Sequence, residues 1–135
     1  MMHQNHPTFL ISLLAISKIG AIASLINTSL ADSSLLHCIK IAKTRLVLFD
    51  PVYAGQVATM AAGAKELGAA LYGYGEGRTD DFPMLTPEVL SEYSSEDTDD
   101  AYLRGITPTD PALLIYTRQD HNNCCLPTIW LNLPL

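Results

Sequence analysis

The sequence predicts an α/β fold in which helices alternate with mostly parallel strands. Stretches with apolar residues at helical spacing are followed repeatedly by short apolar runs that end in turn residues. This alternation is typical of a layered sheet whose parallel strands are connected by helices. A chain of 135 residues with 48% apolar and 16% charged residues is long and apolar enough for one domain with a modest core.

The first predicted unit is a helix over residues 8–19 followed by a strand over residues 21–26. Apolar residues recur at helical spacing in the helix, with Asn5 as its expected N-cap and Pro7 in its first turn. Gly20 ends the helix. The run that follows is short, apolar and closed by a turn, so it is expected to be a buried strand.

Two further helix and strand units follow. Asp32 or Ser33 is expected to cap a helix that runs to residue 43, and residues 45–49 then form a strand. The pair Asp50-Pro51 is a strong helix start. The carboxylate can accept a hydrogen bond from a backbone N–H, and proline has no N–H at the first helical position, where that group would have no partner within the helix. This third helix ends at Gly68, and residues 69–74 form the next strand.

An acidic surface connection separates these units from the last predicted strand. Ten of the 14 acidic residues lie between residues 76 and 110. The connection holds a short helix over residues 87–93 that Thr86 would cap, and residues 112–116 form a buried strand behind Asp110-Pro111. The tail from Arg118 to Leu135 has no clear period and fits no element.

Charge and cysteine content exclude several classes of function. The net charge of −6, with eight Lys and Arg spread along the chain, argues against binding of nucleic acid or anionic lipid.

The three cysteines, Cys38, Cys124 and Cys125, are an odd number without a C-x-x-C spacing. This fits a reducing compartment and neither a disulfide scaffold nor a zinc site. His37 and Cys38 are adjacent, so on a helix their side chains point in different directions and do not easily share a metal. Ordinary helix packing explains both residues.

Two other clusters are weak candidates for metal sites. His121, Cys124 and Cys125 lack a fourth ligand at suitable spacing. The aspartates at 97, 99 and 100 have neither the glycine nor the closing glutamate of an EF-hand loop, so solvated surface explains them better.

The most apolar stretch, residues 9–26, has about the length of a membrane span. Lys18 and Gly20 interrupt it and no basic residues flank it, which argues against a transmembrane helix.

Five sequence blocks stand out along the chain. They are Asn5-His6-Pro7-Thr8-Phe9, Lys18-Ile19-Gly20-Ala21, Leu25-Ile26-Asn27-Thr28, Ser34-Leu35-Leu36-His37-Cys38 and residues 106–117. In this order they resemble blocks of the fatty acid transport protein and very-long-chain acyl-CoA synthetase family of AMP-binding, adenylate-forming enzymes, and five blocks in correct order and spacing are hard to obtain by chance. The fifth resembles the strand that leads into the family's phosphate-binding motif. By the same resemblance, Met1-Met2 falls where the family has a strand.

The resemblance stops after Thr117. The family continues as Ser-Gly-Thr-Thr-Gly-Leu-Pro-Lys, whereas residues 118–125 of this chain contain no glycine, threonine or lysine. We therefore expect a partial N-terminal part of an AMP-binding domain over residues 1–117 and an unrelated tail over residues 118–135. A frameshift, retained intron or alternative splice would produce such a break.

The resemblance implies a chemistry that the tail disrupts. The family converts a fatty acid to acyl-CoA with ATP, Mg²⁺ and coenzyme A. The resemblance also implies membrane association at the endoplasmic reticulum, peroxisome or plasma membrane, on the cytosolic face. Only Thr117 can be carried over as a cofactor-binding residue, and no catalytic or metal residue can be. The pattern alone explains Thr117 as a β-branched residue at a strand end. We expect an inactive fragment, or alternatively an interaction module that binds a membrane or the full-length synthetase.

Overall fold

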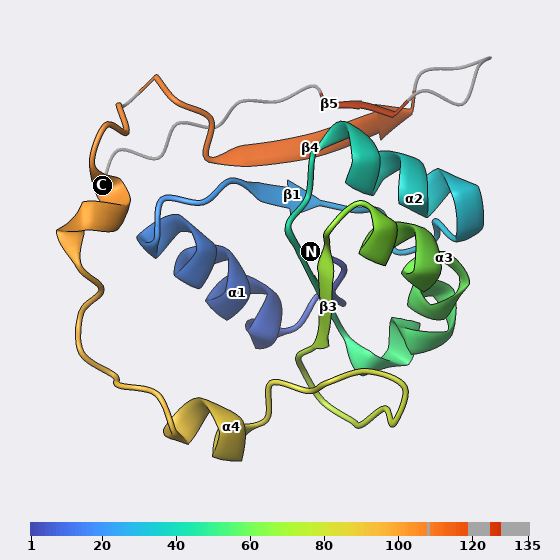
Figure 1. The fold of residues 1–135 in the computed structure, drawn as a ribbon, viewed down its shortest axis with the longest axis horizontal. Helices are drawn as coiled ribbons and strands as arrows, with labels where there is room; N and C mark the ends of the chain where they lie inside the picture. Colours follow the sequence, from blue (N-terminus) through green and yellow to red (C-terminus); the bar gives the residue numbers. More distant parts are fainter. Residues whose placement is uncertain (108, 119–124, 128–135) are drawn as a thin grey trace.

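A computed structural model describes residues 1–107, 109–118 and 125–127. The chain has the predicted α/β architecture, with helices that alternate with parallel strands (Figure 1). The elements are α1 (Pro7–Lys18), β1 (Ala23–Leu25), α2 (Asp32–Ile41), β2 (Leu46–Phe49), α3 (Ala54–Glu66), β3 (Ala70–Gly73), α4 (Pro87–Ser91), β4 (Leu113–Arg118) and β5 (Cys125–Pro127), with 3₁₀ turns at Pro51–Tyr53 and Asp100–Leu103.

The strands form two ladders that the start of the chain connects. One ladder has the order β1-β4-β5 and the other pairs β2 with β3. Between them lie Met1 and Met2, and Met2 forms a parallel bridge with Phe49. The Met2 amide donates to the carbonyl oxygen of Leu48 (2.8 Å), and the Ile26 amide donates to that of Met1 (3.1 Å). The start of the chain therefore occupies the strand position that the family resemblance implied.

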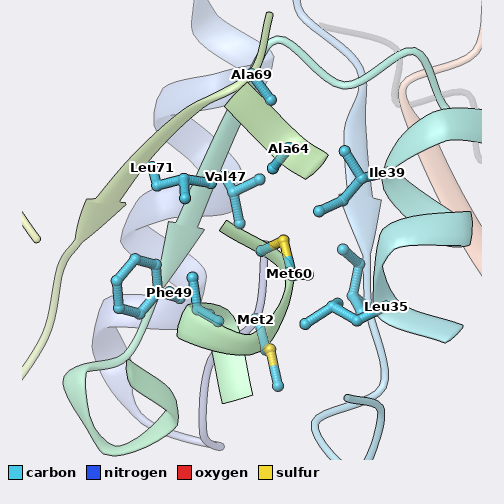
Figure 2. Close-up of a cluster of buried hydrophobic side chains, with 11 residues drawn as sticks. Met2, Leu35, Ile39, Val47, Phe49, Met60, Ala64, Ala69 and Leu71 are labelled. Carbon is cyan, nitrogen blue, oxygen red and sulfur yellow. The ribbon is translucent and has the colours of Figure 1, made fainter. Parts of the chain in front are cut away.

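The core lies on the side of the sheet covered by α2 and α3. These two helices lie together, whereas α1 lies on the opposite side (Figure 1). Figure 2 shows side chains of α2 facing those of β2, β3 and Met2. The buried apolar cluster consists of Met2, Ile26, Leu35, Ile39, Val47, Phe49, Val57, Met60, Ala64, Ala69 and Leu71.

Two helix caps differ from the predicted ones. Because α1 begins at Pro7, the residue directly before it, His6, takes the N-cap position, and its ring accepts from the Thr8 amide; Asn5 lies one residue too early. The N-cap of α2 is Ala31, without a side-chain cap bond. The Asp32 amide instead donates to Thr59 Oγ1 of α3 (3.0 Å), so a tertiary contact replaces the expected local cap.

Other local predictions are confirmed. The Asp50 carboxylate accepts from the Val52 amide and starts a 3₁₀ turn that leads into α3. Thr86 caps α4 by accepting from the Val89 amide. Gly68 follows the end of α3 with a φ of +77°, a conformation that glycine adopts without steric cost.

The end of the chain differs from the expectation that no element forms there. The strand β4 extends to Arg118, and β5 pairs with it antiparallel over Tyr116–Arg118. β5 spans only the three residues Cys125–Pro127 and contains a proline, so its sequence has no strand pattern, which is why the sequence did not predict it.

Leu35→Ala should lower the free energy of unfolding by about 2–5 kcal/mol, because Leu35 is fully buried between α2 and the sheet and its truncation leaves a cavity. Urea unfolding followed by circular dichroism measures the change. The same substitution at half-exposed Leu46 in β2 is the matched control and should cost about 1 kcal/mol or less. Equal losses at both positions would contradict the assigned core.

Candidate functional site

The parallel strands end at one edge of the sheet. β1 pairs parallel with β4, β2 pairs parallel with β3, and Met2 bridges parallel to Phe49. The carboxyl ends of these strands therefore share an edge, and α/β enzymes bind ligands outside such an edge. His3, Asn27, Asp50 and Tyr74 follow the paired segments there, and Thr117 is the next-to-last residue of β4.

Thr117 lies in the part of β4 that extends beyond β1. Its backbone is paired with Leu126 of β5, and the neighbouring Arg118 is paired with Cys125. The structure describes the backbone of Thr117 and not its side chain. Its role as a cofactor-binding residue remains a prediction from the sequence.

Tyr116, one residue earlier, anchors β4 to the rest of the domain. Its hydroxyl donates to the carbonyl oxygen of Cys38 in α2 (3.0 Å) and shares a hydrogen bond with Ser24 Oγ in β1 (2.8 Å). One side chain thus fixes the strand that carries Thr117 against a second strand and a helix. The signal in the sequence was a tyrosine at the end of an apolar strand, since a buried phenol needs a hydrogen-bond partner.

Asp50 lies at the carboxyl end of β2 and is only 7% exposed. Its Oδ1 caps the turn behind β2 by accepting from the Val52 amide (3.3 Å). A Cβ at Gly75 would lie 3.5 Å from Asp50 Oδ2, so the loop after β3 passes close to this carboxylate. The capping role that the sequence indicated for Asp50 is therefore confirmed.

The end of β4 does not fit a nucleotide phosphate group. Phosphate cradles use a loop in which backbone N–H groups and small hydroxyls point at the ligand, and glycines allow the close approach. In this chain the backbone of Thr117 and Arg118 is engaged in an antiparallel ladder with β5. The residues from Arg118 to Cys125 include no glycine.

The weaker candidates have structural roles where they are described. Cys38 is a buried residue of α2. Asp97 pairs with Lys18 at 2.6 Å, which lowers the pKa of its carboxyl, and Asp99 caps a 3₁₀ turn by accepting from the Ala101 amide. His121 and Cys124 lie outside the described residues. Within residues 1–107, 109–118 and 125–127, no three His, Cys, Asp or Glu side chains form a metal site.

The described helices are also too short or too polar to cross a membrane, and this includes the one formed by the apolar stretch near the start of the chain. That stretch divides into α1 and β1, with Gly20 between them at a φ of +67°.

Tyr116→Phe should lower the free energy of unfolding by about 1–3 kcal/mol, because it leaves the Cys38 carbonyl and the Ser24 hydroxyl without the phenol as a partner. Denaturant unfolding measures the change, and hydrogen exchange of the β4 amides should accelerate. The control is Tyr102→Phe, since Tyr102 is exposed and its change should be within about 0.5 kcal/mol of zero. If both variants match the unchanged protein, Tyr116 does not anchor β4.

Comparison with known proteins agrees with the fold. The family model of the AMP-binding enzymes matches residues 1–117. No curated protein sequence matches the chain. Enzymes of this family are adenylate-forming ligases that use ATP and Mg²⁺. Because the match covers 117 of the 135 residues and includes every helix described above, the chain belongs to the AMP-binding enzyme family.

Proposed function

We propose that the chain is a fragment of a fatty acyl-CoA synthetase and that it is catalytically inactive. The family it belongs to activates acyl substrates with ATP. The observation that carries the proposal is the sequence after Thr117, where the glycines, threonines and lysine of the family's phosphate motif are replaced by Arg-Gln-Asp-His-Asn-Asn-Cys-Cys. The intact relative would convert long or very-long-chain fatty acids to acyl-CoA and couple this reaction to fatty acid uptake.

The fatty acyl specificity rests on the sequence blocks. The blocks around Asn5, Lys18, Leu25 and Ser34 resemble those of the fatty acid transport and very-long-chain synthetases. By the same resemblance, we propose that the intact enzyme works at the cytosolic face of a membrane, at the endoplasmic reticulum, peroxisome or plasma membrane.

The inactivity rests on the physical requirements of phosphate binding. A bound triphosphate needs several N–H donors that converge on it, and the glycine-free segment behind β4 cannot take the positive φ angles at low cost. Arg118 supplies positive charge, yet one long side chain does not replace a preorganised set of backbone donors. Loss of the threonines also removes the small hydroxyls of the motif.

The chain should not bind MgATP with a Kd below about 1 mM, a free energy of about −4 kcal/mol. Isothermal titration calorimetry with MgATP measures this, and no fatty-acid-dependent exchange of pyrophosphate into ATP should occur. A matched variant, in which residues 118–125 are replaced by Ser-Gly-Thr-Thr-Gly-Leu-Pro-Lys, reports whether the loop alone limits binding. Submillimolar MgATP binding or pyrophosphate exchange by the unchanged chain would refute the proposed inactivity.

A second candidate function, an interaction module, is favoured by the surface of α1. Its buried residue is the polar Ser12, whereas Leu10, Ile11 and Leu14 are each more than half exposed. A helix with apolar residues on its outer side is normally covered on both sides. Figure 1 shows α1 with the sheet on one side, while the segment between β3 and β4 passes around it. The candidate partner is a membrane or the full-length synthetase.

Replacing Leu10 and Leu14 together by serine should lower binding to a partner by roughly tenfold or more, because half of each side chain loses an apolar contact. Two assays separate the partners: sedimentation with phosphatidylcholine vesicles and pull-down of an intact fatty acyl-CoA synthetase. Val52→Ser changes an exposed apolar residue outside α1 and serves as the control. An interaction module is ruled out if the unchanged chain binds neither partner.

A further inference from the structure

His3 is a buried imidazole next to the start of the chain. It follows Met2 directly, at the point where this segment leaves the sheet, and it is 8% exposed. Within the part of the chain that the structure describes, neither Nδ1 nor Nε2 forms a hydrogen bond. Buried polar atoms are almost always paired, so this arrangement is costly and depends on the charge state of the ring.

The segment next to His3 is the joint between the two ladders. The Ile26 amide donates to the Met1 carbonyl oxygen (3.1 Å), and the Met1 amino group donates to the carbonyl oxygen of Ser24. On the other side, the Met2 amide donates to the Leu48 carbonyl oxygen (2.8 Å) and the Asp50 amide donates to that of Met2 (2.9 Å). If this segment leaves, β1 keeps only its pairing with β4 and β2 keeps only its pairing with β3, so the two ladders lose this connection.

We propose that His3 is an acid-sensitive latch on this joint. While the imidazole is neutral, it stays buried beside Tyr74 and the Met1–Met2 segment remains inserted. When it takes up a proton, a charged ring with two unpaired N–H donors becomes buried, and its hydration drives His3 toward water. Because His3 is adjacent to Met2, its exit withdraws the segment and opens the sheet at the joint.

The charged groups around His3 set the direction of this response. The ring of Tyr74, at the end of β3, meets it edge to face at a centroid distance of 6.1 Å. The Asp50 carboxylate attracts the charged form, but it forms no hydrogen bond with the ring and already caps the turn behind β2. The Met1 amino group repels the charged form. His6 and Glu76 form a more exposed pair (3.3 Å) in the neighbouring loops.

The balance favours the neutral ring. Burial, with a smaller contribution from the Met1 amino group, lowers the pKa of His3 from 6.5 to about 4 against the opposing effect of Asp50. The unfolded or opened chain therefore binds more protons than the closed one between these pH values. The contribution of His3 to the stability of the closed joint is complete above pH 6.5 and is lost as the pH falls toward 4. Burial also lowers the pKa of the Met1 amino group to about 5, which acts in the same direction at higher pH.

Hydrogen exchange at individual amides tests the latch. The Asp50 and Ile26 amides donate to Met2 and Met1, so their protection factors, corrected for the intrinsic pH dependence, should fall between pH 6.5 and pH 4, with His3 contributing a factor on the order of 100 and the Met1 amino group a further fall. The Ala70 amide, which donates to the Arg45 carbonyl oxygen (2.9 Å) between β2 and β3, should stay protected. An equal fall at Ala70 would mean global unfolding and would overturn the proposal.

Two variants test whether the imidazole of His3 is the group that responds to pH. His3→Gln cannot be protonated in this range, so its Asp50 and Ile26 protection should keep only the fall that the Met1 amino group causes, and its total fall should be about 100-fold smaller than that of the unchanged protein. His6→Asn removes the other imidazole near the joint and keeps a residue able to cap α1, and it should behave like the unchanged protein. Parallel curves for His3→Gln and the unchanged protein would overturn the latch.

An NMR titration of the unchanged protein keeps the proposal testable if His3→Gln does not fold. The His3 ring should remain neutral down to about pH 5 in the folded protein, well below the ordinary value of 6.5. A folded protein in which the His3 ring titrates near pH 6.5 would overturn the proposal without any substitution.

Discussion

The insertion of two residues between β1 and β2 is the constraint on which the rest of the structure depends. In the described residues these strands have no direct pairing, and the backbone of Met1 and Met2 supplies the donors and acceptors that each of them needs. The side chain of Met2 is fully buried in the core on the side of α2 and α3. One short segment thus provides both the hydrogen bonds and part of the packing, which is why a buried charge next to it matters.

The helices divide unequally over the sheet, and this division explains where the stability lies. The core cluster takes residues from α2, α3, β2 and β3, and none from α1. The two helices approach closely at Gly63 of α3, where a Cβ would lie 2.6 Å from Leu36 Cδ2 of α2 and would force that side chain to shift. In contrast, α1 turns Ser12 inward and keeps leucines on its outer side. The fold therefore buries one side of its sheet well and leaves an apolar helix as the outer layer of the other.

The sequence predicted what local chemistry controls. Periodicity predicted α1 to α3 and β1 to β3, and capping chemistry predicted the roles of Asp50 and Thr86. It did not predict what contacts between separate elements control. β5 forms because β4 offers it an edge, Ala31 becomes an N-cap because Thr59 engages the Asp32 amide, and His3 is buried because Met2 is held in the sheet. In the candidate site, the family resemblance indicated Thr117, whereas only the structure shows that Tyr116 anchors β4.

The core and the missing phosphate motif lie in different parts of the chain, and this separates folding from catalysis. Every described member of the buried cluster lies between Met2 and Leu71, and among the described residues Tyr116 is the last one packed against it. In the described part of the chain, the core therefore contains no residue after Thr117, where the sequence departs from the family's phosphate motif. The fold and that motif are thus separate requirements, because burial near the start of the chain stabilises the sheet whether or not its carboxyl edge binds a phosphate.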